Sequence, residues 1–525
     1  MKARGCLFTK PNKKVAASIG LFLLLLGGCQ PSPERDVVVN KNESILAEVI
    51  QHSVGGGAYS YPKHKQQEFS YQKFSISFDS LILVPDVTSY PVIRVEDSAF
   101  TQKEADTILA YLVQDGVIQH PTFFMTKAGV MQEIEYYRLL LQALEEGKTL
   151  EDSSYDAESV RSRLAFAQQS WAQAPDDPIY SARTDFGISL GKELEDIGLG
   201  MSNSNDGVKD QYINVDIYRG DERYNLQIQN EYASTGSVLS QCIFARQSDA
   251  RYSSVSDEYC KVDQVELQTS QEEAERLALE TATALGVESP VLSNICGVRR
   301  SLNYGIEEDI LYDSYLWQID ISSTMNGIPV LFVDDGSVSG PDGDQQMEVT
   351  EEGRIVYNLP LYNHETFRVF IGDTGIDKIY WTGRMKAISY ENDDVALMPF
   401  ENVFERISSG LRVMFETGLS ERSYIKFNGL HISQMQLGFM RLLIQDQPGK
   451  SRLIPAWQVV ADSFPVEIDE IKFAQWYRDM YGENPGDQKE IDTLIKLMEA
   501  DTIPPSTVLF VNALDGSIID AELGY

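Results

Sequence analysis

Histidine and cysteine are scarce in this sequence, with five of each among 525 residues. The histidines stand far apart, and no pair of His or Cys has the spacing of zinc ligands. No glycine loop of the kind that cradles phosphate is present. The oxygen-rich segments 203–207 and 334–344 lack the ligand spacing of an EF-hand loop, so they are interpreted as solvated loops. We therefore expect no metal and no cofactor.

Basic residues are also few compared with acidic ones. The chain has 44 Lys and Arg against 79 Asp and Glu, a formal net charge of −35. Such a charge repels nucleic acid and anionic cell-surface polymers, so we expect no nucleic-acid partner. We interpret the surplus of acidic residues as a highly solvated surface. Hydrophobic residues still make up 43% of the chain, enough for a sizeable core.

Only one long apolar run is present, from Val15 to Gly28. As a helix it would reach about 21 Å, short of the ~30 Å hydrocarbon core of a bilayer. Lys and Arg residues precede this run, and Leu26-Gly27-Gly28-Cys29 ends it. This order predicts a secretory signal over residues 1–28, with small residues at the cleavage point.

The Gly27-Gly28 pair before Cys29 resembles the lipobox of bacterial lipoproteins. That resemblance implies a diacylglyceryl thioether on Cys29 and fatty acids such as palmitate. The mature protein would then be tied to the lipid bilayer through Cys29, on the extracytoplasmic face of the cell membrane. Two acyl chains suffice for stable anchoring. The alternative is an ordinary signal peptide followed by a chance cysteine.

Three further cysteines follow Cys29, namely Cys242, Cys260 and Cys296. An extracytoplasmic location permits disulfides, and a bond between Cys242 and Cys260 would close a short loop. We predict this bond, which leaves Cys296 unpaired. The alternative is that all three cysteines are reduced and buried.

The residue pattern predicts an α+β fold, with antiparallel sheets that carry helices on one face. Residues 29–68 contain scattered prolines, glycines and charges, and they are interpreted as a flexible tether. Three packed units are expected after it: 69–185, a small sheet with helices; 186–395, a middle unit; and 396–525, a C-terminal unit.

Several elements have specific signals. Alternating apolar residues predict strands at 74–78, 92–95, 212–218, 224–232, 437–444, 453–460 and 508–511. Apolar stripes of helical period predict helices that begin near Thr101, Val130, Val160, Ser270 and Phe400. Thr101 with Glu104, and Ser270 with Glu273, have the spacing of capping boxes.

A short pattern occurs twice. Trp317-Gln318-Ile319 precedes the strand-like run 330–334, and Trp457-Gln458-Val459 precedes the similar run 508–512. Each set follows an amphipathic helix, which indicates a duplicated unit. The longer spacing in the second copy predicts an inserted arm over residues 465–504. Its aromatic residues Phe473, Trp476 and Tyr477 are candidate partner-binding residues, since aromatics anchor interfaces; alternatively, the arm packs on its own domain.

The order of helix, tryptophan strand and Asp-Gly hairpin resembles the PepSY group of extracytoplasmic modules. The anchored layout is similar to the external regulators of a Gram-positive sensor kinase. Nearly the whole chain resembles a family of uncharacterised Gram-positive gut-bacterial lipoproteins, through segments 28–31, 91–92, 380–381, 455–457 and 512–516. That family has no established activity. PepSY-type modules are associated with inhibiting proteases or modulating surface partners.

Two motifs suggest catalysis. Ser189 in Gly187-Ile188-Ser189-Leu190-Gly191 matches a serine-hydrolase elbow, but the preceding run is too polar for the buried strand that the elbow requires. Asp373-Thr374-Gly375 resembles an aspartic-protease triplet, but a second triplet is missing. Both are interpreted as loops or turns, with His364 and His431 in no recognisable context.

We therefore predict a membrane-anchored, extracytoplasmic, non-catalytic protein that binds or regulates a membrane or surface partner. The first alternative is an extracytoplasmic hydrolase that uses Ser189 or Asp373. The second is a structural envelope protein.

Overall fold

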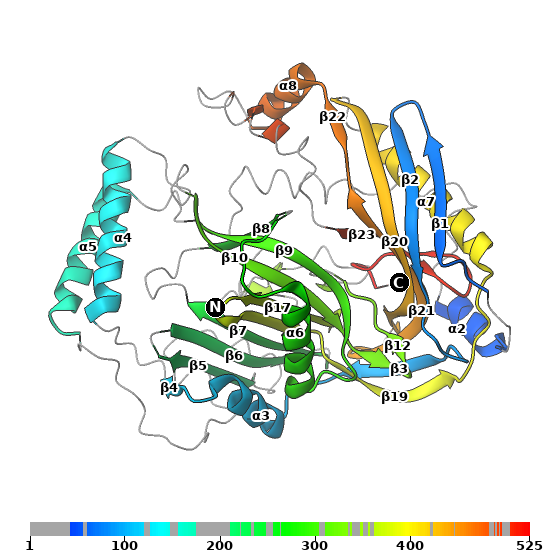
Figure 1. Cartoon of the computed structure of the whole chain (residues 1–525), viewed down its shortest axis with the longest axis horizontal. Helices are drawn as coiled ribbons and strands as arrows, with labels where there is room; N and C mark the ends of the chain where they lie inside the picture. The colour runs from blue at the N-terminus through cyan, green and yellow to red at the C-terminus, as the bar shows by residue number, and fades with distance from the viewer. Residues whose placement is uncertain are drawn as a thin grey trace.

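The computed structural model describes residues 43–55, 60–119, 127–146, 156–174, 211–220, 222–232, 236–247, 256–262, 264–303, 310–333, 337–338, 347–349, 355–357, 362–420, 424–445, 447–481, 488, 491–492, 494–495 and 505–524. Over this part of the chain the fold is α+β, as predicted, and two nine-stranded sheets dominate it (Figure 1). No helix among these residues is long and apolar enough to span a bilayer.

The first sheet, here called the terminal sheet, contains both the earliest and the latest strands of the described chain. Its main path is β1 (His64–Ser70), β2 (Phe74–Leu83), β20 (Ile425–Leu443), β21 (Lys450–Ser463), β23 (Ser506–Asn512) and β24 (Ile518–Ile519). Three strands pair off this path: β3 (Val92–Asp97), β19 (Met385–Asn392) and β22 (Val466–Ile468). β2 pairs with β20 in parallel. The predicted separate unit over 69–185 is therefore corrected, since its strands β2 and β3 complete the sheet of the C-terminal unit.

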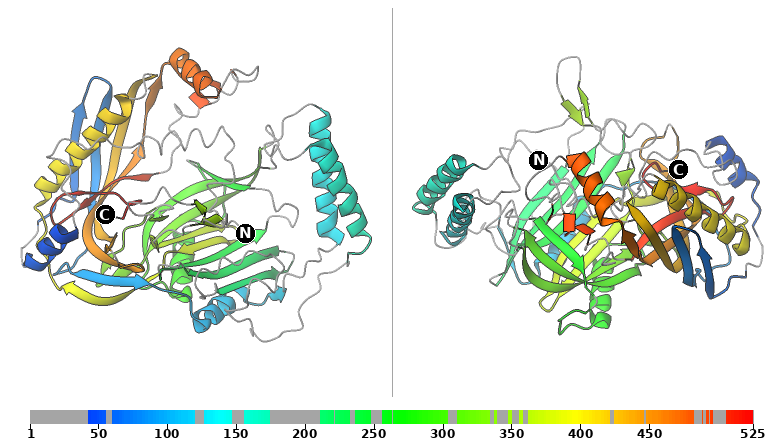
Figure 2. Two further views of the ribbon diagram at one scale, coloured as in Figure 1. Left: turned by 180° about the vertical axis from the view of Figure 1, so that it is seen from behind. Right: turned by 90° about the horizontal axis from the view of Figure 1, so that it is seen from above.

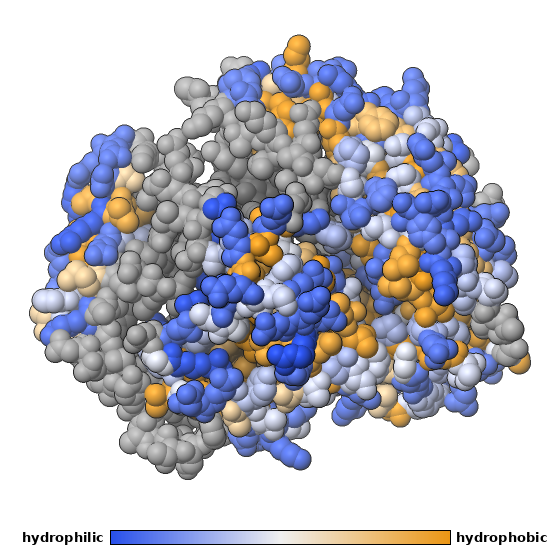
Figure 3. All heavy atoms as spheres, in the orientation of Figure 1, coloured by the Kyte–Doolittle hydropathy of each residue, from blue (hydrophilic) through white to orange (hydrophobic). Residues whose placement is uncertain are grey.

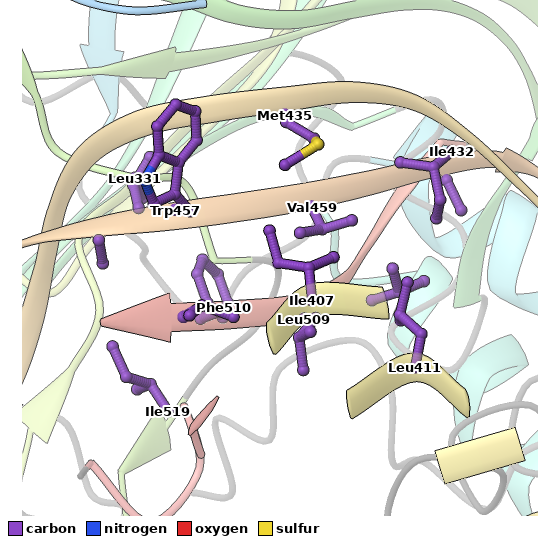
Figure 4. Packing of buried hydrophobic residues seen from close by; sticks show 14 of the residues in the cluster. Leu331, Ile407, Leu411, Ile432, Met435, Trp457, Val459, Leu509, Phe510 and Ile519 are labelled. Carbon is purple, nitrogen blue, oxygen red and sulfur yellow. The ribbon is translucent and has the colours of Figure 1, made fainter. Parts of the chain in front are cut away.

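Helix α7 (Phe400–Ser420) covers the terminal sheet and begins directly after Pro399. Its predicted apolar stripe is buried at Val403, Ile407 and Leu411. Figure 4 shows Ile407 beside Val459 of β21 and Leu509 of β23. The helix therefore buries the stripe that its sequence predicts.

The second sheet, the middle sheet, has the order β4 (Val117–Gln119), β5 (Gln211–Arg219), β6 (Glu222–Tyr232), β7 (Val238–Gln247), β18 (Gly375–Thr382), β17 (Thr366–Gly372), β10 (Ile310–Ser322), β9 (Val291–Asn303) and β8 (Ser256–Lys261). Helices α3 (Gln102–Val113) and α6 (Gln271–Leu285) pack on one face of it (Figure 1). The Thr101–Glu104 capping box is present, Ser270 caps α6, and Gly286 ends α6 at φ 97°.

Helices α4 (Lys127–Glu145) and α5 (Ala157–Trp171) pair with each other and share a small core of their own. The sequence predicted both helices, but it placed them on a sheet. All three views show the pair standing apart from both sheets (Figures 1 and 2).

The predicted tether over 29–68 is also corrected. Residues 29–42 lie outside the described part of the chain, but α2 (Glu43–His52) and β1 belong to the folded body. Ile50 is 2% exposed, and Asn392 donates hydrogen bonds from Nδ2 to the carbonyl oxygens of Ile50 and Ser53.

The two tryptophan segments occupy similar places in the two sheets. Trp317 on β10 pairs with Ile371 on β17, and Trp457 on β21 pairs with Val511 on β23. The strand paired with Trp317 is therefore β17, not residues 330–333 of the run 330–334 that the sequence suggested. That segment crosses to the terminal sheet, where Leu331 donates its N–H to the carbonyl oxygen of Phe439 at 2.8 Å. The duplication itself stays a prediction.

The remaining described elements are short. They are β11 (Thr324–Met325) with β12 (Ile328–Pro329), β13 (Ser337–Val338) with β16 (Tyr362–Asn363), β14 (Met347–Val349) with β15 (Ile355–Tyr357), and helix α8 (Glu470–Tyr481).

Candidate functional site

The structure places Asp373 in the turn between β17 and β18. Its Oδ1 accepts hydrogen bonds from the backbone N–H groups of Gln268 and Thr269, at 2.8 and 2.9 Å. The carboxylate thus ties this turn to the segment that leads into α6, in agreement with the interpretation as a turn. Ser189 and Cys29 lie outside the described residues.

The two candidate bases have separate environments. His364 is buried, and its Nε2 lies 3.0 Å from the carbonyl oxygen of Ala521. His431 is partly exposed on β20, with Nδ1 2.7 Å from Asp462 Oδ1. The two histidines thus have different partners, Ala521 for His364 and Asp462 for His431.

The predicted disulfide between Cys242 and Cys260 is corrected. Cys242 is a buried free thiol on β7, and Cys260 is on β8. Five strand intervals separate β7 from β8 in the middle sheet, a distance of about 24 Å at the usual strand spacing. A disulfide requires Cα atoms within about 7 Å. Burial also raises the pKa of the Cys242 thiol to about 12, so the thiol stays protonated at neutral pH.

The aromatic residues of the predicted arm face their own domain. On α8, Phe473 is 1% and Tyr477 4% exposed, and both belong to the terminal-sheet core. Trp476 is half-buried, with its ring 5.1 Å from that of Tyr424. The assignment of these residues to a partner surface is corrected, because the alternative, packing on their own domain, is what the structure shows. The exposed large apolar residues of α8 are Ile471 and Met480. Figure 3, in the orientation of Figure 1, shows hydrophobic atoms at the top of the molecule, where α8 lies.

Buried charged groups join the two sheets. Arg441 on β20 donates to Asp97 on β3, and its guanidinium lies 4.0 Å from the centre of the Tyr362 ring. It also donates to the carbonyl oxygens of Asn363 and Gly383. These contacts, together with His364, Glu365 and Arg384, form what is here called the junction cluster.

The junction cluster is a structural connection between the sheets. Burial raises the pKa of the Asp97 carboxyl, although Arg441 partly opposes this effect. Burial also raises the pKa of Glu365, which accepts hydrogen bonds from Ser323 and from the Trp381 indole. The guanidinium of Arg384 lies over the Phe100 and Trp381 rings and pairs with Glu104. Because these groups are bonded to one another below the surface, we infer that they hold the two sheets together.

The face of the middle sheet opposite α3 and α6 has a different composition. On β6 the residues Tyr224, Leu226 and Ile228 point into the core under α3 and α6. Strand geometry sends the alternate residues Asn225, Gln227 and Gln229 to the opposite face, where they are half-buried. Figure 2 shows the molecule from behind, opposite to the view in which α6 lies in front of this sheet.

These amides form a hydrogen-bonded row with their neighbours on β5 and β7. Asn225 Nδ2 donates to Asn214 Oδ1 at 2.8 Å, and Gln227 Nε2 donates to Asn225 Oδ1 at 2.9 Å. Gln229 Nε2 donates to Gln241 Oε1 at 3.0 Å. The five residues Asn214, Asn225, Gln227, Gln229 and Gln241 are here called the amide face.

The charged groups that flank the amide face are paired within the sheet. Arg223 donates to Asp216 at 2.7 Å. On the other side, Arg368 donates from Nε and Nη2 to the two carboxylate oxygens of Asp320, at 2.6 and 3.2 Å. Two carboxylates also border the row directly: Asn225 Nδ2 donates to Asp216 Oδ1 at 3.1 Å, and Gln229 Nε2 donates to Glu231 Oε1 at 3.4 Å.

The amide face can bind but is poorly suited to proton transfer. Asn and Gln side chains have no proton that titrates near neutral pH, and they offer both donors and acceptors. Sequence reasoning recognised the β5–β6 hairpin but missed this face. The available signal was the alternation of Asn225, Gln227 and Gln229, three carboxamides at a spacing of two.

Other site types have less support. Among the described residues, no group of three His, Cys, Asp or Glu could hold a metal ion. An open cavity of about 650 Å³ lies beside α6, lined by residues that include Arg276, Glu280, Thr283 and Pro290. Its charged groups are Arg276 and Glu280, which form an exposed ion pair with each other.

Comparison with known proteins yields little. No protein-family model matches the chain, and no curated protein matches it in sequence. The chain is similar to the crystal structure of an uncharacterized protein from Eubacterium rectale ATCC 33656, with a TM-score of 0.41 and 12% sequence identity. The match covers 92% of this chain and 99% of that one.

Proposed function

We propose that this chain is a membrane-anchored extracytoplasmic lipoprotein that binds or regulates a partner without catalysing a reaction, and that the amide face is its binding surface. Cys29 would carry the lipid, and residues 1–28 would be the removed signal. The PepSY-like order of elements, with one tryptophan segment inside each sheet, supports a regulatory function.

The hydrogen-bonded amide row is the observation that carries this proposal. Five carboxamides side by side on one sheet face are unusual, because a solvated sheet face more commonly carries charged residues and Thr. Their chemistry provides recognition through many weak hydrogen bonds and no nucleophile. A binding function follows from that chemistry better than a hydrolytic one.

The test is photo-crosslinking in living cells. A photoreactive residue replaces Gln227 on the amide face, and the matched control carries it at Gln475, an exposed amide on α8. We expect a specific adduct from position 227 and none from position 475. A third strain adds Cys29→Ser, which should lose both palmitate labelling and the adduct, because the protein leaves the membrane.

Equal adducts from positions 227 and 475 would contradict the assignment of the binding surface. Palmitate labelling of the Cys29→Ser protein would contradict the anchor. Hydrolysis of a substrate by the purified protein, lost in Asp373→Asn or Ser189→Ala, would instead support the hydrolase alternative.

A further inference from the structure

We propose that the ligand of the amide face is a carbohydrate: a neutral, hydroxyl-rich chain that lies across the strands of the middle sheet. This inference rests on the proposed binding function and specifies the chemical class of the ligand.

The amide face offers both hydrogen-bond donors and acceptors to a ligand. A carboxamide has two N–H donors and a carbonyl oxygen with two lone pairs. Among the described residues, the bonds within the face leave the carbonyl oxygen of Gln227 and the amino group of Gln241 without a protein partner. A hydroxyl group donates one hydrogen bond and accepts two, so a sugar satisfies neighbouring sites of both kinds.

The charged side chains beside the amide face already have partners, which favours a neutral ligand. The guanidinium groups beside the row are engaged by Asp216 and Asp320, and Lys378 lies 5.8 Å from the centre of the Phe370 ring. A phosphate or sulfate ligand would have to break an existing ion pair, and the acidic chain as a whole would repel it. A neutral ligand meets neither penalty.

The length of the surface and the order of residues along it also suit a sugar chain. The row that begins at Asn214 and Gln227 continues across paired strands to Ile243, Tyr380 and Arg368. From β5 to β10 it crosses five strand intervals, about 24 Å. Apolar Ile243 and aromatic Tyr380 lie between polar ends, an arrangement that suits the C–H face of a sugar ring with hydroxyls at its margin.

An extended peptide fits this surface less well. Peptides commonly bind by adding a strand to an exposed sheet edge, where free backbone groups are available. Strands β6 and β7 lie inside the sheet, with both backbone edges paired. Recognition on the amide face must therefore go through side chains, which favours hydroxyl groups over peptide backbone.

The test uses the whole chain in detergent micelles with four neutral probes: maltoheptaose, cellohexaose, mannohexaose and hexa-N-acetylchitohexaose. Titration calorimetry should detect saturable binding of at least one probe. The double variant Gln227→Ala/Gln229→Ala should weaken it about tenfold, since it removes two side chains that hydrogen-bond the ligand. The control Gln66→Ala/Gln475→Ala, with exposed amides elsewhere, should bind as the wild type does.

Salt provides a second readout. Raising the salt concentration from 0.05 to 0.5 M should change the Kd of a neutral ligand less than twofold, because no charge pair with the ligand is screened. The inference is overturned if no probe binds, if the double variant binds normally, or if affinity falls steeply with salt. A protein adduct from position 227 without carbohydrate binding would keep the proposed function and refute the ligand class, whereas failure of both experiments would refute both.

Discussion

His364 shows how far one residue's environment departs from its sequence context. The ring lies 5.4 Å from the Tyr362 ring, edge to face, and bonds the backbone of Ala521 near the C-terminal end of the described chain. Burial lowers the pKa of His364 from 6.5 to about 4. The sequence suggested His364 as a candidate base, but its burial depends on contacts with residues far away in the chain.

This lowered pKa predicts acid sensitivity. Between pH 6.5 and 4 the unfolded chain binds a proton at His364 and the folded chain does not, so stability is lost as the pH falls through this range. The full contribution is about 3 kcal/mol at 1.36 kcal/mol per pKa unit. Comparing urea unfolding of wild type and His364→Gln at pH 7 and pH 4 measures it, and the variant should show the smaller loss.

Neighbouring groups act in the opposite direction, which is why the comparison uses a variant. The raised pKa values of Asp97 and Glu365 favour the folded state as the pH falls. Thr366→Val, which removes a buried hydroxyl that does not titrate, is the control, and its effect on stability should be the same at pH 7 and pH 4. An unchanged profile in His364→Gln would show that His364 does not titrate in this way.

The amide face and the junction cluster differ in how far the sequence could have predicted them. The bond from Asn225 to Asn214 lies within one hairpin and was within reach of pattern reasoning. By contrast, Arg441 and Asp97 are 344 residues apart. Their pairing depends on which strands become neighbours, and a single sequence carries no local signal for that.

At the scale of elements, local signals gave correct predictions and nonlocal ones did not. The stripes and caps of α3, α6 and α7 fix each helix and its buried face within a few turns. The alternation of β2 likewise shows which side is buried. Nothing in β2 specifies β20 as its parallel partner, because strand pairing depends on closure of a loop of about 350 residues.

The two tryptophan strands give a prediction at this scale. Trp457 is 1% exposed and lies 5.6 and 5.5 Å from the ring centres of Tyr61 and Phe400. Trp317 is only half-buried, and its indole N–H donates to the carbonyl oxygen of Thr269. Trp457→Ala should therefore cost about 3–5 kcal/mol, and Trp317→Ala about 1–3 kcal/mol.

Chemical denaturation of both variants measures the difference. A conservative pair, Trp457→Phe and Trp317→Phe, serves as control, and Trp457→Phe should recover most of the lost stability because an aromatic ring still fills the site. Equal costs for the two alanine variants would support the simpler expectation of energetically equivalent positions in duplicated units.

At the scale of the whole molecule, the three units predicted in chain order become two interleaved sheets. The chain leaves the terminal sheet after β3, builds the middle sheet, and returns with β19, which pairs with β3. The junction cluster lies where these crossings meet. Composition does not predict a discontinuous domain of this kind. Its boundary is formed by segments far apart in the sequence, and no Pro- or Gly-rich linker marks it.

This interleaving predicts that the two sheets unfold together, whereas α4 and α5 form a separate unit. The helical pair has a core of eight buried residues, compared with the much larger clusters under α6 and α7. Small packed units open at lower free energy than the global core. Native-state hydrogen exchange should show the amides of α4 and α5 protected at least about 100-fold less than those of β20 and β21.

The amides of α3 and α6 are the internal control, because these helices pack on the middle sheet. Their protection should approach that of β20, since opening either helix exposes the middle-sheet core, and the junction cluster couples that core to the terminal sheet. Protection of α4 and α5 equal to that of α3 and α6 would mean that the pair gains its stability from the sheets, and that its small core is not an independent unit.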